Sequence, residues 1–319
     1  MCAYPFPAVD TARTSERLTA FLSEYIEEVP VDQYFGDYRT IDWFYKKKKM
    51  IDGGAQLAFP IGKGSSPNNA WARGYDTVGS AGTNNSYNVV YDFANIFDAS
   101  VIAWDEMREI AGSDHRVFDR VAYKRDVVQN TTLMNLNAAY YAATQSVDKT
   151  TTFVTAIDST GACGSLSATT VAQWASRERA HGAAYTADGY GTILQLLQDI
   201  KDIKGKTTVM FTTNAIERAV EKEFNVDVRY SDSPDTLKRG ASKLLIKNIP
   251  IVADADCTAQ TIYFADDMTN KLYVDTEGDM QWFPFESLPN QFVYQAKFVW
   301  RGQQVITDRR GQGKVTTVS

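Results

Sequence analysis

The two histidines are the first residues to test for chemistry, because imidazole is the commonest general base near neutral pH. The sequence contains only His115 and His181. His115 lies in a long predicted helical region, and His181 lies in the stretch Arg179-Ala180-His181-Gly182. Neither has a nucleophile motif beside it, so both are interpreted as surface or helix-end residues. No catalytic residue is predicted, and the protein is not expected to be an enzyme.

Three short motifs resemble binding or catalytic sites, but each lacks an essential part. Gly161-Ala162-Cys163-Gly164 has neither the spacing nor the strand-to-helix setting of a hydrolase nucleophile elbow. Gly205-Lys206-Thr207 resembles the end of a phosphate-binding loop, but Ile200 stands at the required first glycine and the predicted order is helix to strand. Asp254-Ala255-Asp256 begins like a calcium loop, but no glycine follows at the turn position. A structural turn is predicted there, and no cofactor or metal site is expected.

The charge balance argues against a protein that follows nucleic-acid phosphates. Lys and Arg number 33 and Asp and Glu number 39, a net charge of −6, so sequence-specific DNA binding is not expected. The lysine run Lys46-Lys47-Lys48-Lys49 is predicted to lie on a solvated or intersubunit strand, where alternate lysines point to opposite faces.

The remaining bulk properties fit a folded protein kept in a reducing compartment. The three cysteines, Cys2, Cys163 and Cys257, are odd in number and far apart, so reduced thiols are expected, with Cys163 and Cys257 as buried small hydrophobes. No basic start leads into an apolar stretch, and no run approaches the roughly 20 apolar residues of a membrane helix. A cytoplasmic protein without a membrane segment is therefore predicted. At 319 residues and 44% hydrophobic content, two lobes or one lobe with long extensions are expected.

The first 90 residues are predicted to form extensions of a folded body. Residues 1–40 combine prolines with one amphipathic piece, whose apolar residues are Leu18, Phe21, Leu22, Tyr25 and Ile26. Residues 41–52 and 55–61 are predicted to be strands. Seven glycines follow between Gly53 and Gly82, and a two-stranded projection of this kind is only marginally stable alone. Because Trp71 and Tyr75 would be costly to leave in solvent, the projection is predicted to lie on another subunit.

The rest of the chain predicts a long helix followed by an α+β lobe. Residues 98–145 are predicted to be helical, with a break near residues 112–114. The apolar side of the helix after that break is formed by Val117, Val121, Val128, Leu136 and Tyr140. Helix at 193–203, strand at 207–211, a helix from Asn214 and four strands between 243 and 274 follow. The sequence ends with a predicted hairpin, made of a strand at 291–300, a turn at 301–304 and a second strand at 305–307.

This order of elements resembles the tailed-bacteriophage major capsid proteins with the Hong Kong 97-type fold. The closest likeness is in the carboxy-terminal half, in the helix-strand-helix of residues 193–224, in Ile249-Pro250-Ile251-Val252-Ala253-Asp254, in Thr261-Ile262-Tyr263-Phe264 and in Phe298-Val299-Trp300-Arg301-Gly302-Gln303. Where many relatives have glycine before the strand proline, this chain has Asn248, which also tolerates a left-handed backbone.

The resemblance implies an α+β fold with four parts. Residues 1–40 would form an amino-terminal arm and residues 41–90 an extended β-hairpin loop. Residues 91–150 with 271–319 would form a peripheral domain that contains a long spine helix, and residues 151–270 an axial domain. Head-to-tail contacts would close rings.

By the same resemblance the function would be that of a major capsid protein. Hexamers and pentamers would build an icosahedral shell around the double-stranded DNA of a tailed phage, without reading its sequence. The protein would reside in the virion after assembly in the host bacterial cytoplasm. A portal protein at one vertex, and possible separate scaffolding and decoration proteins, would be its partners. The alternative is the shell of an encapsulin-like nanocompartment, and a cytosolic hydrolase is a weaker rival. The residues expected to contact other subunits are Lys63, Trp71, Arg73, Tyr75, Tyr4 and Phe6.

Overall fold

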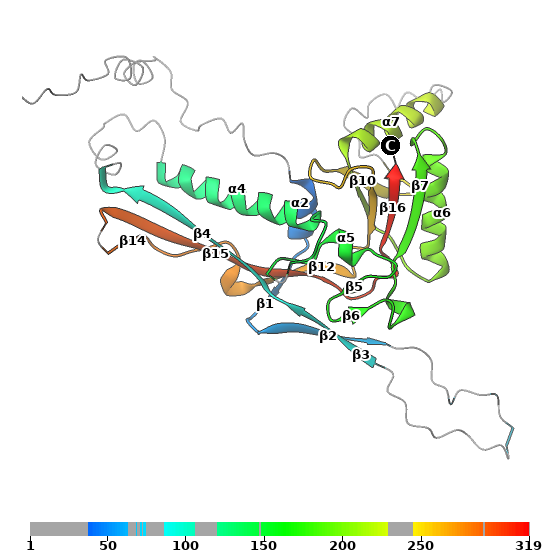
Figure 1. The fold of residues 1–319 in the computed structure, drawn as a ribbon, viewed down its shortest axis with the longest axis horizontal. Coiled ribbons are helices and arrows are strands. Elements are labelled where there is room, and N and C mark those ends of the chain that lie inside the picture. Colours follow the sequence, from blue (N-terminus) through cyan, green and yellow to red (C-terminus); the bar gives the residue numbers. More distant parts are fainter. Residues whose placement is uncertain are drawn as a thin grey trace, which may run out of the picture.

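The computed structural model describes residues 38–62, 68, 71, 73–74, 86–105, 120–146, 148–228, 245–289 and 291–318. The apolar piece predicted in the arm and the helix break predicted near residues 112–114 lie outside these ranges. Figure 1 shows an elongated part, built from a long helix over long strands, beside a compact part in which helices cover a second sheet. A narrow hairpin projects from the region where the two parts meet.

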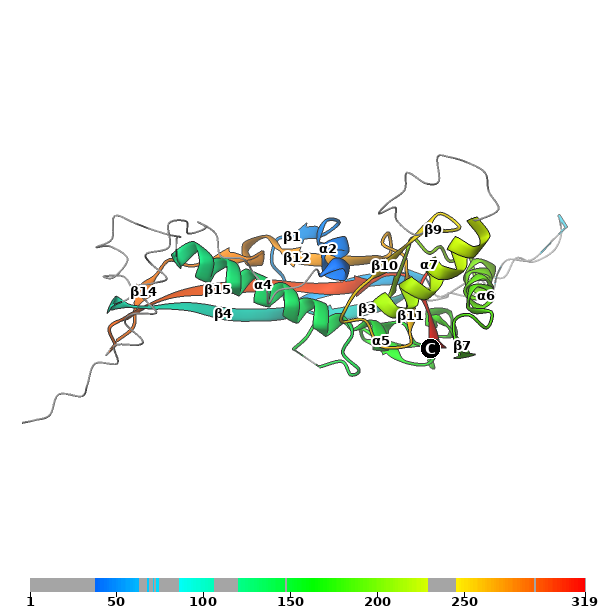
Figure 2. The same cartoon turned by 90° about the horizontal axis from the view of Figure 1, so that it is seen from above.

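The first sheet is organised around one long strand, β15 (Val293–Ile306), which pairs along one edge with β4 (Ala94–Ala103). Its other edge pairs with β12 (Asn270–Asp275), β13 (Gln281–Trp282) and β14 (Glu286–Ser287), and β1 (Lys49–Ile51) joins β12. The helix α4 (Arg120–Tyr140) packs on β4, and Figure 2 shows it running along this sheet.

The second sheet has the order β7-β16-β11-β8-β10-β9 and mixes parallel and antiparallel pairs. Its strands are β7 (Arg177–Ala183), β8 (Val209–Thr212), β9 (Leu245–Ile246), β10 (Ile249–Ala253), β11 (Ile262–Ala265) and β16 (Gly313–Val318). Two helices pack against this sheet: α6 (Gly189–Asp202) contacts β7 and β16, and α7 (Asn214–Val228) contacts β10. The apolar stripe of α6 is buried, including Ile193 and Leu196, as the helical spacing predicted.

The turn between β9 and β10 has the backbone that the sequence predicted. Lys247 and Asn248 have φ angles of 49° and 65°, and Ile246 pairs with Ile249 across them. Two successive left-handed residues are typical of a tight two-residue hairpin turn. The expectation that Asn248 tolerates a left-handed backbone is therefore confirmed.

Residues 41–45 form a helix, so the strand predicted over residues 41–52 is wrong for its first half. The helix α2 runs over Arg39–Tyr45, and only Lys49–Ile51 form a strand. Ile41 and Phe44, three positions apart, lie on one helix face and are each 1% exposed in the core. The run of aromatic residues resembled a strand locally, but burial against the rest of the fold selected the helical spacing.

The lysine run that follows α2 binds carboxylates of its own subunit. Lys46 pairs with Asp42 at 2.8 Å, while Lys47 pairs with Asp267 and Lys48 with Asp279. Lys47 also lies 4.4 Å from the centre of the Trp43 ring and Lys48 lies 4.1 Å from that of Tyr45. The predicted strand is confirmed only for Lys49, which begins β1, and Lys46, Lys47 and Lys49 are exposed as expected of a solvated run. The strand is wrong for Lys46, Lys47 and Lys48, of which Lys47 and Lys48 connect the end of α2 to Asp267 and Asp279.

Two further expectations are corrected in the elongated part. The region 98–103 belongs to β4 and not to the long helix, although the predicted apolar side of that helix is confirmed at Val128, Leu136 and Tyr140, which are buried. Residues 301–304 continue β15 and form no turn. Their polar side chains misled the sequence interpretation, since the Gln303 side chain accepts a hydrogen bond from the Thr151 amide and is buried.

Short elements join the two sheets through a shared aromatic core. These are α5 (Phe153–Ala156), β5 (Ala162–Cys163), β6 (Leu166–Ser167) and the 3-10 turns η1 (Ala172–Trp174) and η2 (Thr276–Gly278). Phe153 of α5 stacks on Tyr140 of α4, with ring centres 5.2 Å apart, and on Phe211 of β8, with ring centres 5.8 Å apart. One ring thus connects the long helix with the second sheet.

Candidate assembly surfaces

The projecting hairpin is amphipathic along its whole described length. It consists of β2 (Gln56–Gly62) and β3 (Ser86–Asp92), paired in register. The apolar residues pair across one face, as Leu57 with Tyr91, Phe59 with Val89 and Ile61 with Tyr87. Leu57, Val89 and Tyr91, at the base, are buried, whereas Ile61 and Tyr87, toward the tip, are only half-buried. The apolar face therefore becomes less covered toward the tip, where Ile61 and Tyr87 still pack against the core but remain partly exposed.

The base of the hairpin is held by a second small hairpin, β5–β6. The Tyr91 hydroxyl donates to the Ile306 carbonyl at 2.8 Å, and the Ser165 amide donates to the Val90 carbonyl at 3.1 Å. Gly164 has a φ of +62°, and a Cβ there would lie 2.6 Å from a methyl group of Val89. Only glycine fits this close approach without displacement. The base is therefore a fixed part of the body.

Of the predicted contact residues, the structure describes Trp71 and Arg73. Trp71 is 106% exposed and Arg73 is also exposed. The other four, Lys63, Tyr75, Tyr4 and Phe6, lie outside the described residues. The structure thus shows a large apolar side chain held in solvent beyond the hairpin, which is the condition that the sequence analysis expected of a contact residue.

Further exposed apolar side chains lie along the first sheet and were missed by sequence reasoning. They are Phe97, Val101, Trp104, Phe283, Phe285 and Phe292, and we call this set the distal apolar patch. Phe292 is 87% exposed, whereas Phe298 in the same predicted strand is fully buried. The patch was missed because residues 98–103 were expected to be helical. The large apolar residues of β4 fall in the adjacent pairs Ile96-Phe97 and Val101-Ile102 and so gave no alternating strand signal.

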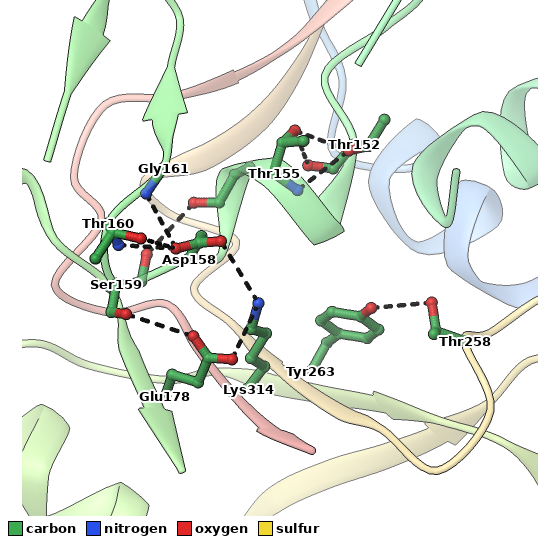
Figure 3. A network of polar contacts seen from close by, with 12 residues as sticks. Thr152, Thr155, Asp158, Ser159, Thr160, Gly161, Glu178, Thr258, Tyr263 and Lys314 are labelled. Carbon is green, nitrogen blue, oxygen red and sulfur yellow. Dashed lines mark hydrogen bonds and ion pairs between the residues drawn. The ribbon is translucent and has the colours of Figure 1, made fainter. Parts of the chain in front are cut away.

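Near the junction of the two sheets, an acidic and basic network fixes the loop after α5 to the second sheet (Figure 3). The Asp158 carboxylate accepts hydrogen bonds from the amides of Thr160 and Gly161, at 2.7 and 3.0 Å. Lys314 of β16 lies 3.9 Å from this carboxylate and 3.3 Å from that of Glu178 on β7. Burial alone would raise the pKa of Asp158, but these amides and Lys314 outweigh it, so the pKa is lowered. The carboxylate is therefore held ionised as a structural group.

Arg309, which is fully buried, reinforces the same loop. Its guanidinium donates to the carbonyls of Ala156, Asp158 and Gly161, at 2.8, 2.7 and 3.0 Å. Burial lowers the pKa of Arg309, because no carboxylate among its hydrogen-bond partners compensates for the lost water. Its role is to bind carbonyls that would otherwise be buried without partners.

Asp254 and Asp256 form the structural turn that the sequence predicted. The Asp254 carboxylate accepts hydrogen bonds from the Thr40 amide at 3.0 Å, the Asn137 side chain at 2.9 Å and the Asp256 amide at 3.0 Å. The turn therefore joins the start of α2 to the end of α4. Nearby, Cys257 is buried, as is the distant Cys163, and burial raises the pKa of both thiols. The expectation that Cys163 and Cys257 are buried is confirmed.

Both ring nitrogens of His181 have hydrogen-bonding partners, Thr192 at 2.8 Å and the Ala184 carbonyl at 3.0 Å. Within the described ranges no group of three or more His, Cys, Asp or Glu residues could hold a metal ion. In the same ranges no helix combines the length and apolar character needed to cross a bilayer. The exposed apolar side chains are Trp71 and the distal apolar patch. Exposed apolar side chains of this size are typical of surfaces that bind another protein.

Solved structures share this fold over almost the whole chain, although no protein-family model and no curated protein sequence matches it. The capsid asymmetric unit of cyanophage A-1(L) superposes with a TM-score of 0.69 at 13% identity, covering 94% of this chain and 98% of that one. The capsid of a native GTA particle gives 0.66 at 13% identity, covering 98% and 100%. The SrpI encapsulin of Synechococcus elongatus gives 0.59 at 8% identity, covering 98% and 97%.

These similarities establish the fold of the chain, although its sequence is only 8% to 13% identical to those of the three structures. The chain has the mixed α+β fold of phage-type capsid subunits, as its order of elements predicted. Encapsulin shells share it.

Proposed function

We propose that this protein is the major capsid protein of a tailed phage and builds an icosahedral shell of hexamers and pentamers around double-stranded DNA. The observation that carries the proposal is the pairing of this fold with a hairpin whose apolar face and Trp71 extend into solvent. In an isolated subunit these apolar side chains stay in contact with water, whereas in an assembly a neighbouring subunit covers them.

The Hong Kong 97-type architecture accounts for each part of the molecule. In this proposal β2 and β3 are the extended loop, α4 is the spine helix, and α4, β4 and β15 build the peripheral domain. The second sheet with α6 and α7 is the axial domain, around which rings close. Because β16 pairs with β11 and β7, we assign it to the axial domain together with residues 151–270. Residues 1–40 are the arm that reaches another subunit.

The shell is held by many modest contacts in this proposal. The hairpin lies over a neighbour, the arm reaches another, and the distal apolar patch meets further copies where peripheral domains converge. When several contacts hold one subunit, the rupture of any one is reversed locally, because the partners remain at high effective concentration. The role is structural rather than enzymatic.

Partners and location follow from the same proposal. A portal protein occupies one vertex, separate scaffolding and decoration proteins are possible partners, and the protein resides in the virion after assembly in the host cytoplasm. The net charge of −6 suits a wall that encloses DNA without gripping it.

Electron microscopy of the purified full chain tests the proposal directly. Closed shells are expected, and deletion of residues 60–74 should leave soluble rings or monomers. A compact monomer at all concentrations, alone or with its partners, would contradict the shell. Normal shells from the deletion variant would contradict the role given to the hairpin.

The content of purified particles separates the phage proposal from its alternative, the encapsulin-like compartment. Double-stranded DNA with portal and tail proteins supports a phage head. One enriched cargo enzyme without a genome supports a nanocompartment. The higher TM-scores of the phage and GTA capsids favour the phage proposal.

A further inference from the structure

One continuous segment, residues 291–318, supplies a strand to each of the two large sheets. It contains β15 and β16, which follow every other described strand in chain order. The two strands do not pair with each other, because β15 belongs to the first sheet and β16 to the second. The strand pairs of the segment are therefore all made with earlier parts of the chain. We call residues 291–318 the closing segment.

In the first sheet, three strands have β15 as their only partner. The strands β4, β13 and β14 each pair with β15 and with no other strand of the described residues. Without β15, only the parallel pair of β1 and β12 would remain of this sheet. Two strands by themselves are at most marginally stable in water. The first sheet therefore exists only when the closing segment is in place.

In the second sheet, β16 lies between β7 and β11. Among the described strands β7 pairs with β16 alone, and Lys314 of β16 lies 3.3 Å from the carboxylate of Glu178 on β7. Loss of β16 would thus detach β7 and leave β11, all of whose residues are buried, as an open edge. An open apolar edge promotes aggregation. The second sheet is therefore also incomplete without the closing segment.

The closing segment also contributes to each of the three hydrophobic clusters of the subunit. Six of its apolar side chains are at most 2% exposed. They are Phe298 and Trp300 in the shared aromatic core, Val315 and Val318 among the side chains of α6 and α7, and Val305 and Ile306 at the base of the hairpin. Between the two strands, Arg309 binds the carbonyls of the loop after α5. No cluster is complete until this segment has docked.

We propose that the closing segment controls when a subunit can assemble. Its partners lie far away in the chain, so its docking costs loop-closure entropy before it gains contacts, and it docks late. Both sheets are then completed together, and only after synthesis has passed residue 318. A chain that stops before the segment has neither complete sheet and is kept out of the shell. This exclusion rests on the proposed function, whereas the completion of the sheets does not.

Cutting the folded chain beside the closing segment tests the completion of the sheets. A site for a sequence-specific protease is inserted after Pro289, an exposed residue in the turn between β14 and β15. The variant also carries Trp71→Ala to keep the subunits unassembled. After cutting, the two pieces should elute together under native conditions and separate in urea. The urea midpoint of the cut protein should fall on dilution, because unfolding now releases a second molecule, whereas that of the uncut protein should stay constant.

Two results of this cut would overturn the inference. One is a body that keeps both sheets, as judged by hydrogen exchange, after the closing segment has been washed away. The other is a midpoint of the cut protein that does not change with dilution. Either result would show that the remaining strands fold without the segment.

Co-expression tests the exclusion from the shell. The unaltered chain is produced together with a tagged chain that ends at residue 290 or, as the control, with an equally tagged full chain. The control should enter shells in proportion to its synthesis, and the short chain at least ~30-fold less, as expected when the folded state is lost. Entry of the short chain at the level of the control would overturn the inference. Absence of shells from the unaltered chain would overturn the proposed function and leave the result on the cut subunit standing.

Discussion

The base and the tip of the β2–β3 hairpin share one alternating pattern but differ in what their apolar side chains contact. At the base, Leu57, Val89 and Tyr91 pack into the subunit's own core. Beyond the last paired residues, Trp71 is 106% exposed. The comparison teaches that one amphipathic hairpin can serve two purposes: the part that its own core reaches stabilises the subunit, and the part beyond it is available only to a partner.

The largest expected effect is at the base. Tyr91→Ala removes a ring that is 3% exposed, so the free energy of unfolding should fall by about 4 kcal/mol. Tyr91→Phe keeps the ring and loses only the contacts of the hydroxyl, with the Ile306 carbonyl and the Cys163 sulfur, so about 1 kcal/mol is expected. Urea unfolding of subunits that also carry Trp71→Ala, the substitution expected to prevent assembly, measures both. Equal losses in the two variants would show that the ring is not part of the core.

A smaller effect is expected from glycines at the two ends of the hairpin. Gly164→Ala would place a Cβ 2.6 Å from Val89 at a φ of +62°, and a loss of about 2 kcal/mol in unfolding free energy is expected. Gly62→Ala, at the far end of β2, meets no atom within 4 Å and should change stability by less than about 0.5 kcal/mol. If Gly62→Ala proved the more costly, the base would not be the anchored end.

Acid should lower the free energy of unfolding of the subunit through Asp267, which lies in the folded body and not in the hairpin. Burial alone would raise the pKa of Asp267, but hydrogen bonds from Lys47 and Thr208 outweigh it, so the pKa is lowered. Its stabilising contribution is present above the ordinary carboxyl pKa of about 3.9 and is lost as pH falls through the lower pKa of the folded state.

Urea unfolding measured across this pH range checks whether the free energy of unfolding falls as the pH is lowered. Asp267→Asn should reduce stability at neutral pH by about 1 kcal/mol and flatten the acid dependence. Asp42→Asn, at an exposed pair with Lys46, is the control and should change stability by less than about 0.5 kcal/mol. If Asp267→Asn leaves the pH dependence of the unfolding free energy unchanged, that dependence comes from other carboxylates.

The smallest effect on the subunit is expected at the tip. Trp71→Ala should leave the free energy of unfolding within about 0.5 kcal/mol, because the side chain is fully exposed. The same variant should nevertheless fail to form shells at concentrations at which the unaltered protein does, as measured by light scattering and electron microscopy. A destabilised subunit would show that Trp71 contacts its own chain, and normal assembly would remove it from the interface.

The sequence by itself determined the elements whose pattern is local. The stripe of α6 and the left-handed turn at Asn248 follow from side-chain spacing and backbone preference, which act over a few residues. The helix α7 was also predicted, but the side chain at its start that accepts a backbone hydrogen bond, from Ile216, is Thr213 and not Asn214. The exposure of Trp71 was foreseen for the same reason, since the glycine-rich stretch around it offers no apolar partner of its own.

Only the tertiary structure decided the elements that depend on distant partners. Residues 41–45 became a helix because Asp254 and Asn137 bind its first amides and the core buries Ile41 and Phe44. The long strand β15 passes through polar Gln303 and Gln304 because neighbouring strands and loops satisfy their side chains. Such contacts join residues that are far apart in the chain, so no local sequence pattern records them.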